Sequence, residues 1–193
     1  MKQGSVAALL ASASFLLAAC SSGGTSDTTA TSQTSGYLQT LPAVAVPAAA
    51  STGSAAAVPT SATVVGDLRY GTDYLILYMD GHSCGAAVIH QQARQAAVNL
   101  TAAPPSTSNG GSATIPGGPY ETGTTTDADD PNTHATLSCA RDTIVVQYTT
   151  GHPATPSEVH GPVTTIPAQQ GSSSIVVALG TTDNRHAVEA HFA

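Results

Sequence analysis

The chain has 193 residues, a length that corresponds to one domain or to one domain with tails. It has 5 basic and 12 acidic residues, and its hydrophobic share of 41% includes few aromatic residues, which is enough for a modest aliphatic core. Contacts with nucleic-acid phosphates need clustered Lys or Arg. Beyond Lys2 the basic residues are four scattered arginines, so we expect no nucleic-acid partner.

The first 20 residues have the features of an export signal. Lys2 provides a positive start, and the stretch from Val6 to Ala18 is apolar apart from two serines. This stretch is too short for a permanent transmembrane helix and has the length of a signal-peptide hydrophobic region. It ends in Leu17-Ala18-Ala19-Cys20, which is followed by Ser and Gly residues.

This ending resembles the signal of bacterial lipoproteins, in which Leu and two small residues precede a Cys that is lipidated and becomes residue one. The resemblance implies a signal peptide over 1–19 and a lipid anchor on Cys20, with the membrane as a partner. The residue after the Cys is Ser21 and not Asp. In that family, Ser at this position is associated with the outer membrane of two-membrane bacteria. We therefore expect a location on the outer membrane, facing the periplasm or the cell surface. The alternative is an ordinary secretory signal with a chance Cys.

Residues 20–62 have the composition of a tether. They are mostly Ser, Thr, Ala, Gly and Pro, with Asp27 as the only charge. Such a segment buries too little apolar surface to offset its loss of conformational entropy, so it is predicted to be flexible. The globular domain is expected over 63–193. Alternatively, Tyr37–Leu41 adds a strand to that domain.

The domain is predicted to be of the α+β class, with a small antiparallel sheet, one helix and one disulfide. Strand signals occur over 63–70 and 73–79, and a helix over 85–100 follows from the spacing of Ile89, Ala93, Ala96 and Leu100. Hairpins are predicted for 135–139 with 143–148, and for 174–179 with 185–192. Residues 103–133 and 151–172 are expected to be long loops.

Two cysteines remain after lipidation, Cys84 and Cys139. In an exported domain such a pair forms a disulfide more often than a metal site or a reactive thiol. Closing a loop of about 55 residues contributes about 4 kcal/mol in the chain-entropy model. We therefore predict a structural disulfide between the start of the helix and the first hairpin.

The sequence Gly81-His82-Ser83-Cys84-Gly85 follows an apolar strand and precedes the predicted helix. It resembles the nucleophile elbow of the α/β-hydrolases, with Ser83 as the nucleophile. The resemblance implies Asp183 as the orienting acid and His191 as the base of a triad. The chain is too short for the family's multistranded core, and a Gly-x-Ser-x-Gly arises easily in so Gly- and Ser-rich a sequence. The other interpretation is a strand-to-helix turn with Ser83 as the cap.

Metal sites have weak support in the sequence. His186 and His191 are five residues apart and would face opposite sides of a strand, and only loop histidines such as His134, His152 and His160 could converge. The acidic segment 127–132 lacks the Gly and the distal Glu of a calcium loop, so it is interpreted as a solvated loop. We expect neither a metal nor a cofactor.

These features together predict an envelope lipoprotein with a non-catalytic binding or structural domain. Its partner is expected to be an envelope protein or a glycan. A small serine esterase that uses Ser83 is the alternative from another class, and a periplasmic metal-binding protein is a third.

Overall fold

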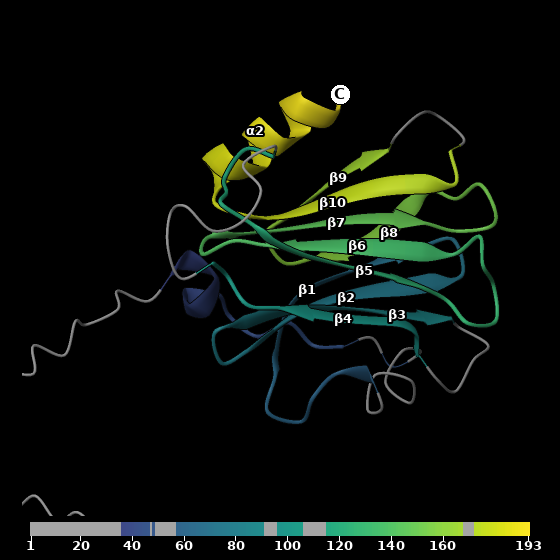
Figure 1. Ribbon diagram of the computed structural model, residues 1–193, viewed down its shortest axis with the longest axis horizontal. Coiled ribbons are helices and arrows are strands. Elements are labelled where there is room, and N and C mark those ends of the chain that lie inside the picture. The colour runs from purple at the N-terminus through teal and green to yellow at the C-terminus, as the bar shows by residue number, and fades with distance from the viewer. Residues whose placement is uncertain (1–35, 47, 49–56, 91–95, 106–114, 168–171) are drawn as a thin grey trace, which may run out of the picture. The chain divides into compact units, whose positions relative to one another are not determined.

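The computed structural model describes residues 36–46, 48, 57–90, 96–105, 115–167 and 172–193 (Figure 1). The predicted signal peptide, the lipid site Cys20 and most of the N-terminal half of the tether lie outside the described residues. Among the described residues, no helix is both long and apolar enough to cross a membrane.

In the described part of the chain, ten strands form two antiparallel sheets of five strands each. The first sheet has the order β4-β3-β2-β1-β8 and the second the order β5-β6-β7-β10-β9 (Figure 1). The first sheet is built from β1 (Thr63–Tyr70), β2 (Asp73–Asp80), β3 (Ser83–His90), β4 (Ala96–Ala102) and β8 (Pro156–His160). The second is built from β5 (Glu121–Thr126), β6 (His134–Cys139), β7 (Thr143–Thr149), β9 (Val163–Pro167) and β10 (Ser174–Gly180). The described helices are η1 (Tyr37–Thr40) and α2 (Thr182–Phe192).

The antiparallel strands, the helix and the disulfide of the expected fold are confirmed, but the strands form two sheets. The inner faces of these sheets share one aliphatic core, to which β2 contributes Leu75 and Leu77 and the second sheet contributes Val146 and Val177. The domain is therefore mainly β, and the α+β class describes it only loosely.

The outer face of the first sheet is covered by residues that precede β1. We call the described residues 36–46 and 57–62 the N-terminal strap. Val44 donates a backbone hydrogen bond to Val64 O at 2.8 Å, and Val44, Val46 and Ala57 pack on the outward-facing Tyr74 and its neighbours. Leu38 is 1% exposed and belongs to the core between the sheets. The packed part of the chain thus includes residues that the composition assigns to the tether.

The second sheet is covered on its outer face by α2. Val188 is fully buried against Val145, Val176 and Ala178 of that sheet. Thr181 caps the helix, since its hydroxyl accepts a hydrogen bond from the Asn184 amide at 3.3 Å. The chain that was expected to form a strand over 185–192 is therefore helical, and only the β10 half of that predicted hairpin is correct.

The helix predicted over 85–100 is wrong, because this stretch contains β3 and β4. Both faces of β3 are buried: Cys84, Ala86 and Val88 face the inter-sheet core, whereas Ala87 and Ile89 face the strap side. A strand buried on both faces has no alternation of polar and apolar residues to distinguish it from a helix. The strands expected over 63–70 and 73–79 and the hairpin of β6 and β7 are confirmed, while the two expected long loops contain β5, β8 and β9.

Candidate functional site

Ser83 lies in a β-hairpin and not in a strand–turn–helix elbow. β2 ends at Asp80, β3 begins at Ser83, and these two residues pair across the turn of Gly81 and His82. Gly81 has a φ of 59°, which Gly adopts without strain and which tight hairpin turns require. The second glycine of the motif, Gly85, pairs with Tyr78 under its aromatic ring. The hairpin therefore explains why glycine occupies both positions of the motif.

Asp183 and His191 lie in the first and last turns of α2. Eight residues along a helix correspond to about 12 Å of axial separation. This is too far for the carboxylate-to-imidazole hydrogen bond that orients the base of a triad. α2 also packs on β9 and β10, in the sheet to which Ser83 does not belong. The structure thus does not bring the acid and the base of the suggested triad together.

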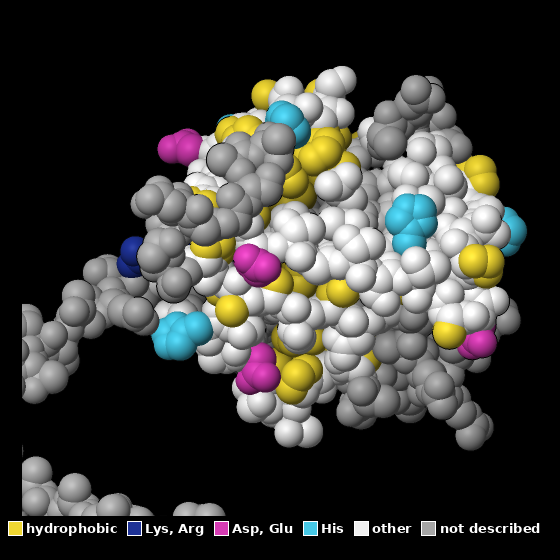
Figure 2. Space-filling model, in the orientation of Figure 1, with side chains coloured by type: hydrophobic (Ala, Val, Ile, Leu, Met, Phe, Trp, Pro, Cys, Tyr) yellow, Lys and Arg dark blue, Asp and Glu magenta, His cyan; other side chains and the backbone are white. Residues whose placement is uncertain are grey.

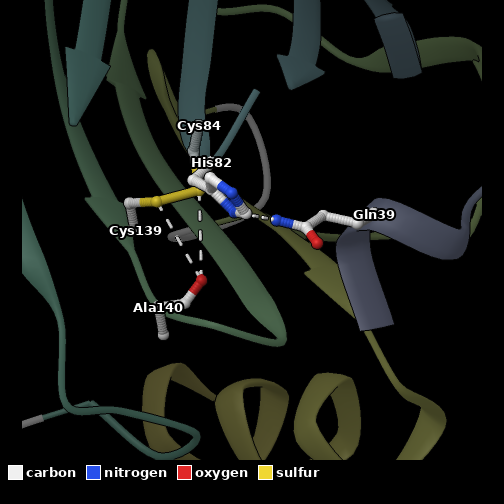
Figure 3. Close-up of a disulfide and its surroundings, with 5 residues drawn as sticks. All are labelled: Gln39, His82, Cys84, Cys139 and Ala140. Atoms are coloured by element: carbon white, nitrogen blue, oxygen red, sulfur yellow. Dashed lines mark hydrogen bonds between the residues drawn. A yellow bond between two sulfur atoms is a disulfide. The ribbon is translucent and has the colours of Figure 1, made fainter. Parts of the chain in front are cut away.

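Cys84 and Cys139 form the predicted disulfide, with their Cα atoms 5.8 Å apart (Figure 3). The bond joins β3 of the first sheet to β6 of the second, and both residues are fully buried. The Ala140 carbonyl oxygen lies about 4 Å from both sulfurs, which is a packing contact because a disulfide has no S–H to donate. Close to the disulfide, Gln39 of η1 bonds His82 Nδ1 at 2.6 Å, which ties the strap to the β2–β3 turn (Figure 3).

A polar cluster joins the two sheets at the other end of β3. His90 ends β3, and its Nδ1 lies 2.6 Å from Asp73 Oδ1 of β2, while its Nε2 lies 3.1 Å from Asp127 Oδ2. Asp127 follows β5 in the second sheet. Tyr148 of β7 donates its hydroxyl to the other oxygen of Asp73 at 2.7 Å. We call Asp73, His90, Asp127 and Tyr148 the His90 clasp.

The charges of the His90 clasp favour a protonated imidazole. Partial burial alone would lower the pKa of His90, but hydrogen bonds and charges from Asp73 and Asp127 together raise it above its ordinary value. Burial, with the negative charge and hydrogen bond of Asp73, raises the pKa of Tyr148 so far that its hydroxyl stays a donor. When both ring nitrogens are protonated, His90 has no lone pair for a metal or for general base catalysis. The clasp can hold a proton and link the sheets.

A second buried carboxylate lies on β1. Asp67 is fully buried, and its Oδ1 lies 3.0 Å from Nδ1 of His160 on β8, whose side chain is 52% exposed. Its Oδ2 is buried without a hydrogen-bond partner. Burial raises the pKa of Asp67; the hydrogen bond and charge of His160 oppose this shift, and the charge of Glu158 adds to it. Asp67 therefore resists ionisation more than an exposed Asp does.

Two carboxylates of the acidic segment 127–132, those of Asp127 and Asp130, accept hydrogen bonds within its own turn. Asp127 Oδ1 accepts from the Asp129 amide, and Asp130 accepts from Asn132 and Thr133. These hydrogen bonds lower the pKa of Asp130. Asp127 is 7% exposed, so the segment is only partly the solvated loop that the sequence predicted. In the parts of the chain described above, no group of three or more His, Cys, Asp or Glu residues could hold a metal ion.

Sequence reasoning missed the His90 clasp. Its members are spread over residues 73 to 148, and His90 was assigned to a helix that does not form. The only local signal was an Asp at the start of the apolar run of β2, and one sequence gives no reason to pair it with a residue of another sheet.

Comparison of the chain with protein-family models, with curated proteins and with solved structures finds no significant match.

Proposed function

We propose that the chain is a bacterial envelope lipoprotein, held on the membrane by acyl chains on Cys20, with a non-catalytic binding or structural domain. The observation that carries the export part of this proposal is the buried disulfide between Cys84 and Cys139. Disulfides form and persist in oxidising compartments outside the cytosol. A disulfide-linked domain therefore agrees with the location outside the cytosol that the Leu17-Ala18-Ala19-Cys20 motif predicts.

The strap packs on the domain although the composition assigns its residues to the tether. Leu38 lies in the core between the sheets, the Tyr37 amide donates a hydrogen bond to Asp142, and Gln39 bonds His82.

Uncharged polar groups support an envelope protein or a glycan as the partner. In the face shown in Figure 2, uncharged side chains and backbone cover more of the surface than charged side chains do. On β5 and β6, hydroxyls form cross-strand pairs, Thr122 with Ser138 and Thr124 with Thr136, both at 3.2 Å. Thr122 and Thr124 are exposed. Such groups recognise a partner through hydrogen bonds and not through net charge.

Membrane fractionation of a Cys20→Ala variant in a bacterial host tests the anchor. The wild type is expected in the membrane fraction, and the variant is expected to be released or to keep its unprocessed signal. Globomycin, which blocks the lipoprotein signal peptidase, should cause a precursor to accumulate for the wild type only. Ser21→Ala is the matched control and should remain on the membrane. A Cys20→Ala protein that is processed and remains as firmly attached as the wild type would contradict the proposal.

A serine-reactive fluorophosphonate probe tests the non-catalytic part. Neither the wild type nor Ser83→Ala should be labelled above the background of the unfolded chain. Labelling of the wild type that is lost in Ser83→Ala would show that Ser83 is an activated nucleophile, and the non-catalytic domain would then be rejected.

A further inference from the structure

The His90 clasp links two sheets that are also linked by the disulfide. Cys84 and His90 both belong to β3 and are six residues apart, so the two links lie about 20 Å apart along the strand. The disulfide is covalent and does not respond to pH. The clasp depends on one proton, because both nitrogens of His90 can donate hydrogen bonds to carboxylates only in the imidazolium form.

The two halves of the clasp differ in strength. Asp73 is the nearer carboxylate, at 2.6 Å, and it is held in place by the buried hydroxyl of Tyr148. Asp127 is farther away, at 3.1 Å, and it lies at the start of the turn that leads to β6. When His90 loses a proton, the remaining N–H is expected on Nδ1, facing Asp73. A lone pair on Nε2 then faces the Asp127 carboxylate, and this hydrogen bond is replaced by repulsion.

We propose that the His90 clasp is a proton-operated latch between the sheets: imidazolium His90 holds the 127–133 turn, and neutral His90 releases it. The titratable groups that face His90 and its carboxylates are Asp73 from β2, Asp127 from the turn after β5 and Tyr148 from β7. The disulfide end stays closed in both states. The fold thus contains a part that responds to a rise in pH while the rest remains folded.

Release of Asp127 has a direct reporter in the backbone. The Asp129 amide donates to Asp127 Oδ1 at 2.9 Å, and the Asp127 amide donates to Thr133 O at 2.8 Å. If the Asp127 side chain moves, the protection of these amides from hydrogen exchange decreases. The amides of β7 close to the disulfide, such as those of Val145 and Val146, serve as the internal reference.

Hydrogen exchange of the purified full chain at pH 5.5 and pH 8.5, corrected for the intrinsic pH dependence of exchange, tests the latch. In the wild type, protection of residues 127–133 should fall by about tenfold at the higher pH, the factor that corresponds to one charge-assisted hydrogen bond. The Val145 and Val146 amides should not change. In His90→Gln the pH dependence of 127–133 should disappear, and in His134→Gln, a variant of an exposed His on β6, it should persist. Equal protection at both pH values in the wild type, or an unchanged pH dependence in His90→Gln, would overturn the proposal.

Nitrogen-15 NMR of the His90 ring in the wild type gives a test that does not depend on the stability of a variant. The latch predicts that Nε2 loses its proton on titration and that Nδ1 keeps it. Loss of the Nδ1 proton instead would mean that the hydrogen bond to Asp73, and not the one to Asp127, is lost. That result would overturn the release of Asp127.

Discussion

Tyr78 lies over Gly85 on the neighbouring strand so closely that a Cβ atom at residue 85 would overlap the tyrosine ring. The Tyr78 hydroxyl in turn bonds Asn99 on β4, and the Asn99 amide bonds the Ala57 carbonyl of the strap. One aromatic side chain thus connects the hairpin that contains Ser83 with the segment that covers the outer face of the first sheet. The second Gly of the Gly-x-Ser-x-Gly motif is the residue that makes this arrangement possible.

Gly85→Ala is expected to destabilise the domain. The methyl group would displace the Tyr78 ring, and overpacking of this kind costs about 1–3 kcal/mol. Gly123→Ala on β5 is the matched control, because a Cβ there would meet Leu100 at an ordinary 3.6 Å. Urea unfolding of both variants checks the prediction. A Gly85→Ala protein as stable as Gly123→Ala would contradict the packing of Tyr78 on Gly85.

Removal of the disulfide is expected to cost about 4 kcal/mol, because the bond closes a loop of 55 residues in the unfolded chain. For the double variant Cys84→Ala/Cys139→Ala this corresponds to a decrease in Tm of roughly 10 °C. Thermal unfolding followed by circular dichroism measures it. A reducing agent should lower the Tm of the wild type toward that of the double variant and should leave the double variant unchanged. If the reducing agent lowers the Tm of both proteins equally, its effect does not come from the Cys84–Cys139 bond.

Leu38→Ala tests whether the strap is part of the folded domain. Leu38 is buried between the sheets although it lies 25 residues before β1, and truncation of a buried Leu costs about 2–5 kcal/mol. Val159→Ala on β8 is the control, since Val159 is 42% exposed and its truncation should change stability by less than about 0.5 kcal/mol. Chemical denaturation compares the two variants. Equal stabilities would mean that the strap does not contribute to the core.

Asp67→Asn is expected to change how stability depends on pH. The pKa of Asp67 is raised in the folded state, so its stabilising contribution is complete below the ordinary value of 3.8 and is lost as pH rises through the folded value. Asn does not titrate and avoids this loss. The free energy of unfolding of Asp67→Asn should therefore increase relative to the wild type as the pH is raised from 3.8.

Denaturation at a series of pH values measures this difference. Glu189→Gln, a change at an exposed residue of α2, is the control and should follow the wild type at every pH. A difference between Asp67→Asn and the wild type that is the same at every pH would show that Asp67 has no raised pKa in the fold.

The sequence predicts strands well where local signals agree. Asp73 to Met79 is a continuous run of β-forming residues between glycines, and β6 and β7 follow each other across a short turn. Sequence reasoning fails where burial depends on a distant segment. Ala87 and Ile89 lie under the strap, so β3 is apolar on both faces. Without the strap in view, the spacing of Ile89, Ala93, Ala96 and Leu100 matches a helix.

The C-terminal helix could have been found from its cap. Thr181 precedes Thr182 and Asp183, which is a favourable start for a helix, and Ala187, Glu189 and Ala190 are good helix formers. The turn-like residues 180–184 instead suggested a hairpin. The disulfide was predictable because Cys84 and Cys139 are the two cysteines that follow the predicted signal. The His90 clasp was not, since its contacts depend on which sheets face each other.

Mass spectrometry of the N-terminal peptide of the mature protein, purified from bacterial membranes, shows whether Cys20 is the lipid-bearing first residue. We predict a peptide that begins at residue 20, with the mass of a diacylglyceryl group on its cysteine sulfur. A mature protein that begins at another residue, or that carries an unmodified Cys20, would contradict it.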